Sequence, residues 1–222
     1  MRQEIKIEKK ASEVIQPETV EEAQDAICTR KDLSGANLRG MALGNIHAVG
    51  AILRKTDLTN ADLSHGLLIN PNFYKAALHN TAAFNTVIIS GDLVKTSFNQ
   101  ADLSDSAIIG ANASEASFEG TNLRNAALVG TNFSDANFTR ADLTGARLAG
   151  LDVTDADFTD VNLAGARAQN VNWEKAKVPP QVLPQPIIQL PAWVWSVLLG
   201  GFLGFFALLI YSLTRPKQKS TD

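Results

Sequence analysis

An apolar residue occupies every fifth position from Leu33 to Val178, and the phase never slips. These 30 positions hold 15 Leu, six Phe, four Ala, two Ile, two Val and one Trp. Two residues earlier, 23 of the 30 positions carry Ala, Thr, Gly or Ser; directly before the apolar residue, 16 of 30 carry Asp or Asn. A period of five fits neither the 3.6-residue period of a helix nor the two-residue period of a strand. The pattern therefore predicts neither an amphipathic helix nor simple strands.

A unit of five residues cannot bury its own apolar side chain, so it has to stack on copies of itself, as the units of solenoids do. If four units complete one coil, residues 20 apart lie directly above one another. Phe98, Phe118, Phe138 and Phe158 have this spacing, which an interior column of rings requires. Thirty units then make about 7.5 coils, and the rod is about 36 Å long at a spacing of roughly 4.8 Å per coil.

The units TNLRN, ANFTR, ADLTG and ADFTD resemble the A(D/N)LXX pattern of the pentapeptide repeat family. The resemblance covers residues 31–178, about two-thirds of the chain. It implies an all-β fold, a right-handed quadrilateral β-helix in which the central Leu or Phe and the small residue two positions earlier point inward. Pro71 occupies one of the small-residue positions and removes a backbone donor, and Ala83 replaces a large central residue. We expect a local distortion between residues 71 and 88, with the register kept.

The segments outside the repeat have distinct characters. Residues 1–30 form an N-terminal segment, in which Thr19 and Glu22 make a capping box and Val20, Ala23 and Ile27 form one apolar helical stripe. We expect this helix to cap the first coil. Five prolines in residues 178–191 predict an extended spacer over 179–191. Residues 192–213 contain no charged side chain, and 214–222 form a basic polar tail.

One of the four sides of the predicted coil is apolar where the others are polar. In segments such as TVIIS (86–90), the two outward positions carry aliphatic residues in place of Asp, Asn, Ser or Thr. Strand propensity is one explanation, because β-branched residues favour strands. A docking face is the other, because large exposed apolar patches mark interaction sites. The second is the preferred interpretation, with the partner-binding residues Leu67, Ile69, Phe84, Val87, Ile89, Ile109, Val129, Arg147 and Arg167.

Residues 192–213 have the length and composition of a transmembrane helix. At a rise of 1.5 Å per residue they span about 33 Å, and a hydrocarbon core is about 30 Å thick. Interfacial aromatics lie at both ends of the segment. Small residues at every fourth position, which favour close packing against another transmembrane helix, are Ala192, Ser196, Gly200 and Gly204.

The orientation of this anchor rests on conflicting charges. Arg215, Lys217 and Lys219 after the helix favour a cytoplasmic tail, whereas a tail anchor leaves the repeat domain in the cytoplasm. We expect the second arrangement, a single-pass C-terminal anchor with a cytoplasmic repeat domain. The family is abundant in cyanobacteria, so the resemblance implies a bacterial inner membrane or a thylakoid membrane.

The composition argues against several classes of function. The net charge of −3 is too small for a nucleic-acid binder, and one cysteine excludes an internal disulfide. No catalytic constellation, phosphate loop or metal-ligand spacing is present, so we expect no enzyme activity, cofactor, metal or small-molecule substrate. The predicted function is a membrane-anchored scaffold or assembly factor that binds another membrane protein or complex. The alternative follows from the resemblance: some family members mimic duplex DNA and bind DNA gyrase.

Overall fold

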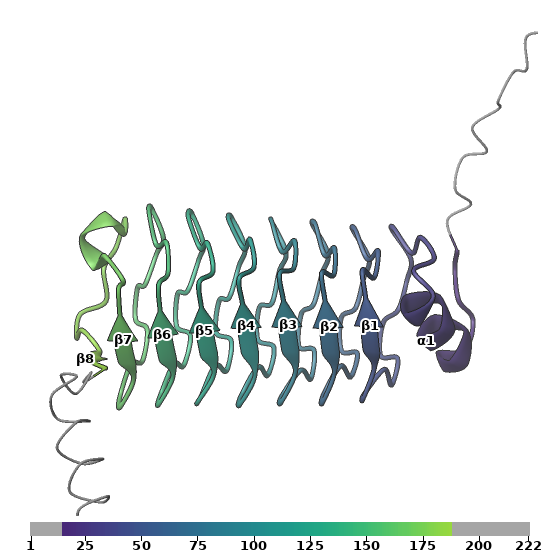
Figure 1. Cartoon of the computed structure of the whole chain (residues 1–222), viewed down its shortest axis with the longest axis horizontal. Helices are drawn as coiled ribbons and strands as arrows, with labels where there is room; N and C mark the ends of the chain where they lie inside the picture. The colour runs from purple at the N-terminus through teal and green to yellow at the C-terminus, as the bar shows by residue number, and fades with distance from the viewer. Residues whose placement is uncertain (1–14, 188–222) are drawn as a thin grey trace, which may run out of the picture. The chain divides into compact units, whose positions relative to one another are not determined.

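A computed structural model of the chain describes residues 15–187. A short helix, α1 (Val20–Cys28), is followed by stacked coils (Figure 1). A 3-10 turn at Trp173–Lys175 follows the last complete coil. Seven short strands lie side by side along the rod, and an eighth follows the 3-10 turn. They are β1 (His47–Val49), β2 (Leu67–Ile69), β3 (Val87–Ile89), β4 (Ala107–Ile109), β5 (Ala127–Val129), β6 (Arg147–Ala149), β7 (Arg167–Gln169) and β8 (Gln185–Pro186).

The coils repeat every 20 residues, as the spacing of the phenylalanines predicts. β1 to β7 pair in parallel in sequence order, with Ala48 opposite Leu68 and Leu68 opposite Ile88. Isolated parallel bridges with the same offset, such as Asp32 with Ile52, join the other sides. Each coil therefore has four five-residue faces, called first to fourth here. Their central residues in the first coil are Leu33, Leu38, Leu43 and Ala48.

The Asp or Asn before the central residue has a structural role on the first three faces. Its side-chain oxygen accepts the backbone N–H two residues later, as in Ser34 to Asp32 (2.9 Å) and Thr59 to Asp57 (3.0 Å). This Asx turn closes the corner after a single bridge residue. The fourth face carries no Asp or Asn at that position, and its backbone stays extended for three residues to form the strands β1–β7. The lack of Asp or Asn is not sufficient, because the units of Ile52 and Ala77 on other faces also lack it and still turn after a single bridge residue.

The interior is filled by the central residues and by the small residues two positions before them. The rings of Phe98, Phe118, Phe138 and Phe158 stack with centroids 4.9–5.0 Å apart and interplanar angles of 5–9°, which confirms the predicted column. Where a threonine occupies the position two residues before the central residue, its buried hydroxyl keeps a hydrogen bond. The hydroxyl of Thr121, for example, donates to the carbonyl of Phe98 at 2.8 Å.

The N-terminal helix caps the first coil, as its stripe of apolar residues predicts. The Thr19 hydroxyl accepts the backbone N–H of Glu22 (3.1 Å), and the Glu22 carboxylate accepts the N–H of Glu18 (2.9 Å). Ala23 and Ile27 are buried against the coil interior, and Val20 packs at its edge.

The predicted distortion between residues 71 and 88 is absent. Pro71 lies at the corner that follows the fourth face, and its coil pairs in the common register. At this corner the equivalent residues, such as Ala51 and Gly91, donate no backbone hydrogen bond. Proline therefore removes no bond there, whereas at the other corners the equivalent N–H bonds to a carbonyl three residues back, as in Ala36 to Leu33.

The compact unit extends beyond the predicted boundary at residue 178 and ends at Pro186. β8 pairs with β7, and the N–H of Gln185 donates to the carbonyl of Ala166 at 3.1 Å. Proline is tolerated on an edge strand because its missing donor faces away from the sheet. Two residues of the predicted spacer, Gln185 and Pro186, therefore form the last strand of the sheet. Within residues 15–187, no helix is long and apolar enough to cross a membrane.

Candidate protein-docking face

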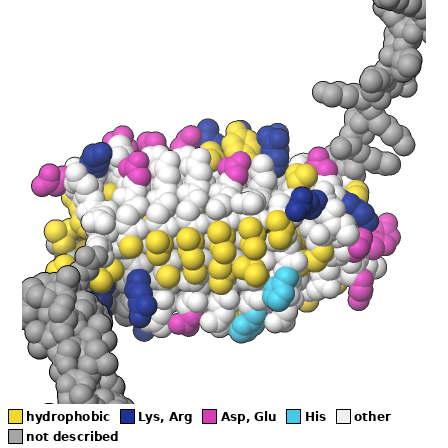
Figure 2. Space-filling view, in the orientation of Figure 1, with side chains coloured by type: hydrophobic (Ala, Val, Ile, Leu, Met, Phe, Trp, Pro, Cys, Tyr) yellow, Lys and Arg dark blue, Asp and Glu magenta, His cyan; other side chains and the backbone are white. Residues whose placement is uncertain are grey.

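Outward side chains of the fourth face form a continuous apolar strip across β1–β6, with two apolar residues in each of β2–β5 and one in each of β1 and β6. Central residues such as Ile88 and Ile108 point into the interior, and their neighbours on either side point outward. Figure 2 shows these neighbours as rows of hydrophobic side chains along the rod. We call the following set the apolar strip: Val49, Leu67, Ile69, Val87, Ile89, Ala107, Ile109, Ala127, Val129 and Ala149.

The exposure of the strip is substantial for aliphatic side chains. Val49, Ile109 and Val129 are 43%, 37% and 38% exposed, and the remaining members are half-buried by their neighbours. At about 4.8 Å per strand, the strip runs for about 24 Å from β1 to β6. Covering a row of aliphatic side chains of this length with another apolar surface is favourable, because it removes apolar area from water.

Strand propensity explains one half of the strip. The residues after the central position lie in extended backbone, which favours the Val and Ile found there. The residues before it include Leu67, Ala107 and Ala127, which are not β-branched. From β2 to β5 this column contains no polar residue, and strand propensity does not explain its leucine and alanines.

Cationic groups lie at both ends of the strip. Arg147 and Arg167 are exposed in β6 and β7, and neither forms an ion pair within the described part of the chain. At the other end, Nε of Arg30 donates to the carbonyl of Val49 at 2.6 Å. The sequence analysis missed Arg30, because its position depends on how the chain passes from α1 into the first coil.

Two apolar side chains close to this face in the sequence, Phe84 and Val94, differ in their placement. Phe84 is half-buried in the turn before β3, and its ring contacts His65 edge-on with centroids 5.0 Å apart. Phe84 therefore borders the strip. Val94 lies in the turn after Leu93, one face further around the coil, and does not join the strip. A corner of the coil separates Val94 from the fourth face.

A second exposed apolar site lies where the chain closes the coil. Val182 and Leu183 are 75% and 59% exposed, and Leu183 borders shallow hollows with Trp173 and Val171. The repeat pattern could not reveal this site, because residues 179–186 lie outside the five-residue period. The four small residues predicted to pack a membrane helix also fall beyond residue 187, outside the described residues: Ala192, Ser196, Gly200 and Gly204.

The aspartates that directly precede the central residues are engaged in turns. The hydroxyl of Thr159 donates to Asp157 at 2.6 Å, and its N–H donates at 2.9 Å. The bond from this hydroxyl lowers the pKa of Asp157, whereas burial raises it. The bond from the Thr159 N–H and the positive charge of Lys177 lower the pKa further. Asp32 and Asp152 have lowered pKa values because Ser34 and Thr154 donate to them in the same way. Within residues 15–187 no three His, Cys, Asp or Glu side chains are grouped to hold a metal ion.

A comparison with models of protein families identifies the family of the repeat. A family model described as pentapeptide repeats (eight copies) matches residues 32–68, 85–120, 116–155 and 136–172, which together make up more than half of the chain. A search of curated protein sequences found no match.

Several solved structures are similar to this chain. A trypsin-treated form of QnrB1, a plasmid-mediated fluoroquinolone resistance protein, is 21% identical with a TM-score of 0.40, covering 79% of this chain and 91% of its own. HetL, involved in heterocyst differentiation regulation in the cyanobacterium Nostoc sp. strain PCC 7120, is 21% identical with a TM-score of 0.22 over 68% and 86% of the two chains. A pentapeptide repeat protein of the Arabidopsis thaliana thylakoid lumen is 25% identical with a TM-score of 0.21 over 62% and 74%. At these scores the likenesses identify no partner for this chain.

Proposed function

The chain belongs to the pentapeptide repeat family, and from this premise we propose that it is a non-enzymatic scaffold that docks a partner protein on its fourth face. Proteins of this family are generally structural or interaction proteins. The observation that carries the proposal is the apolar strip, because it occupies positions that the other three faces fill mostly with polar residues. Its core would be the hydrophobic centre of an interface, surrounded by a polar rim.

The charges around the strip specify the chemistry of the partner. Arg147 and Arg167 at one end and Arg30 at the other favour a partner whose apolar surface is flanked by carboxylates. Arginine suits this role because its planar guanidinium binds a carboxylate through two parallel hydrogen bonds. Such charged ends would orient the partner along the rod, while the aliphatic side chains supply most of the affinity.

We further propose that the partner is a membrane protein or complex and that residues 192–213 anchor the scaffold beside it. The support is in the sequence: 22 residues without a charge, flanked by aromatic residues. Anchoring would turn docking into a reaction between neighbours in one membrane and raise the effective concentration. The small residues from Ala192 to Gly204 would provide a second contact inside the bilayer. In this proposal the repeat domain faces the cytoplasm of a cell with a bacterial inner or thylakoid membrane.

The DNA-mimic alternative finds no support in the charges. Residues 31–178 carry 15 carboxylates and 12 basic side chains, whereas a mimic of duplex DNA needs a strongly acidic surface. Three of the basic residues, Lys55, Lys75 and Lys95, follow one another on a single corner of the coil. We therefore do not propose a topoisomerase as the partner.

The proposal is tested by purifying the full chain from mildly solubilised native membranes. One bait is the wild type, and the other carries Val87→Lys with Ile89→Lys in the middle of the strip. The second bait should lose the co-purified partner, because two buried ammonium groups would lack counter-charges at the interface. Circular dichroism should show that both baits are folded, since both side chains point outward.

The matched control carries Ala77→Lys with Ser117→Lys. Both residues are half-buried and precede the central residue of the second face, so the control adds the same charge on another side of the rod. It should retain the partner. If the Val87/Ile89 variant keeps every partner of the wild type, the strip is not a docking face, and the aliphatic residues there serve only the strands.

A further inference from the structure

The corner that follows the first face carries a charged side chain in six successive coils. These residues are the second of the two turn residues and have left-handed backbone conformations with φ of 54–59°. The first three are basic and the last three are acidic. We call this column the charged ridge, and it consists of Lys55, Lys75, Lys95, Glu115, Asp135 and Asp155.

At the other three corners the same position is occupied mainly by uncharged residues. After the fourth face it holds Gly50, Gly110, Gly130 and Gly150 among others, and after the third face Asn45, Asn85 and Asn125. Glycine and asparagine adopt the left-handed conformation more readily than lysine or glutamate does. Backbone preference therefore does not select the ridge, and its side chains call for another explanation.

The order of charges along the ridge is also unfavourable within one molecule. Residues in register on adjacent parallel coils lie about 4.8 Å apart, and like charges directly opposite each other are destabilising. An alternating order would place an ion pair at each step. The sorted order allows one at the junction, where Nζ of Lys95 lies 3.2 Å from Glu115. A partner with the reverse order of charges would relieve the repulsion in both blocks.

A second copy of the chain carries that reverse order. We propose that two copies associate side by side and antiparallel through the charged ridge, about a two-fold axis midway between Lys95 and Glu115. This operation places Lys55 opposite Asp155 of the second copy and Lys75 opposite its Asp135. Because both rods have the same rise per coil, all six pairs are in register at once. An interface about a two-fold axis must be self-complementary in this way.

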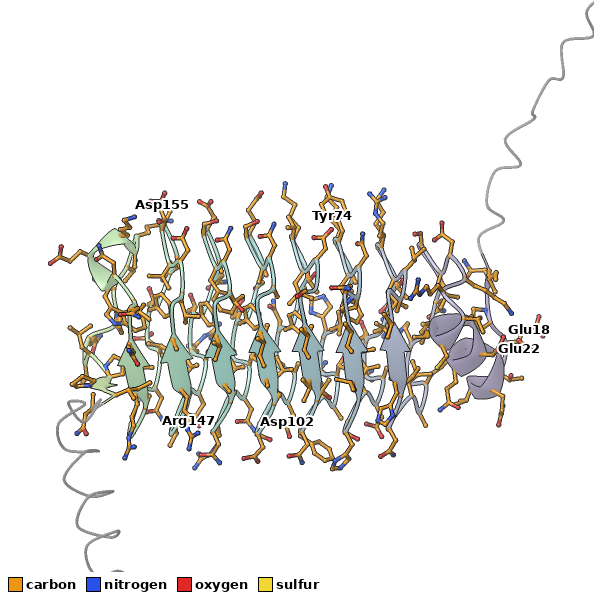
Figure 3. All side chains as sticks on the ribbon, in the orientation of Figure 1. Glu18, Glu22, Tyr74, Asp102, Arg147 and Asp155 are labelled. Carbon is orange, nitrogen blue, oxygen red and sulfur yellow. The ribbon has the colours of Figure 1, made fainter. Side chains whose placement is uncertain are left out.

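The surroundings of the ridge are compatible with this arrangement. Figure 3 shows Asp155 and Tyr74, which precedes Lys75 in the sequence, on the same edge of the rod. Beyond the two blocks, Gly35 would face Lys175, so no like charges meet. The guanidinium of Arg54 lies 5.3 Å from the Tyr74 ring and would approach the acidic block of the second copy. The association is independent of docking through the fourth face.

Cysteine cross-linking of the full chain tests the geometry. In a Cys28→Ser background in mild non-ionic detergent, Val94→Cys places thiols next to the axis, about 5 Å apart along the rod, whereas Thr154→Cys places them about 24 Å apart. A short bismaleimide should cross-link the first variant and leave the second monomeric. Equal cross-linking of both would indicate a parallel pair, and cross-linking of neither would indicate no side-by-side pair. Either result overturns the proposal.

Charge reversal tests the cause. Two variants are made in the Val94→Cys background. The basic-block variant carries Lys55→Glu, Lys75→Glu and Lys95→Glu, and the acidic-block variant carries Glu115→Lys, Asp135→Lys and Asp155→Lys. Each should cross-link about tenfold less than the parent at 50 mM salt. Mixed together they should recover a heterodimer, and 500 mM salt should abolish cross-linking in the parent. A matched control with glutamate at Asn60, Asn80 and Gln100, the same position on the next corner, should cross-link as the parent does. Equal loss in this control, or no recovery on mixing, would refute pairing through the ridge.

Discussion

The phenylalanine column offers the sharpest test of what stabilises the coil. Phe118 is fully buried between Phe98 and Phe138, with ring centroids 5.0 and 4.9 Å away and interplanar angles of 9° and 5°. Phe133 contacts it edge-on at 5.6 Å. Phe73 is also fully buried in the central position, but it belongs to no aromatic pair within the described residues. The two sites therefore differ mainly in their aromatic neighbours.

Leucine is the commonest central residue, so Phe118→Leu and Phe73→Leu both introduce a side chain that the coil accommodates elsewhere. Each substitution lowers the stability because a smaller side chain buries less apolar surface and leaves a cavity. These two losses are similar at both sites, so they largely cancel when the two variants are compared. Phe118→Leu also loses three aromatic pairs, each contributing about 0.5–1.5 kcal/mol. Since leucine restores part of the dispersion contact, we expect Phe118→Leu to cost about 1.5–3 kcal/mol more than Phe73→Leu.

The assay is urea unfolding of both full-length variants in the same detergent, followed by far-UV circular dichroism. The slope of the transition should match that of the wild type, because a solenoid that unfolds in parts would give a shallower slope. The difference between the two midpoints then reports the aromatic contribution. If the two variants lose stability to within about 0.5 kcal/mol of each other, stacking of the rings contributes little and hydrophobic volume alone stabilises the interior.

Three further substitutions test other contacts. Pro71→Ala should change the stability to urea by less than about 1 kcal/mol, because only the stiffness of the unfolded chain is lost and no hydrogen bond is gained. Thr121→Val should cost about 1 kcal/mol in the same assay, because the buried bond from its hydroxyl to the carbonyl of Phe98 disappears. Because the pKa of Asp157 is lowered in the fold, its contribution to stability is present above the unfolded pKa of about 4 and is lost as pH falls through the lower native value. Thr159→Val should reduce this loss in an acid titration of the unfolding midpoint, and an unchanged titration would contradict the assignment.

Much of the apolar strip could be predicted from the sequence. The in-register spacing of 20 placed Leu67, Val87 and Ile109 on one side of the rod, and the structure has them there. The same reasoning did not locate the corners of the coil, which separate Val94 from the strip. It also missed the charged ridge, although every twentieth residue from Lys55 to Asp155 is charged and was open to the same test.

The ends of the rod show the limit of the periodic pattern. Inside the repeat every coil has the same neighbours above and below, so one rule holds for all of them. At the ends that rule stops, and the chain satisfies its last backbone groups by contacts that depend on local geometry. The pairing of Gln185 and Pro186 with β7 and the contact of Arg30 with Val49 are of this kind. Neither has a signal in the five-residue period.

The sequence by itself determined the stacking of five-residue units, the 20-residue register and the column of aromatic rings, because an apolar residue at every fifth position is buried only when the units stack on one another. The tertiary structure decided which face becomes a strand, why Pro71 is tolerated and which residues close the two ends. These features depend on the hydrogen bonds that each corner makes with the coils above and below it. Residues far apart in the sequence contribute those bonds, so a local pattern does not encode them.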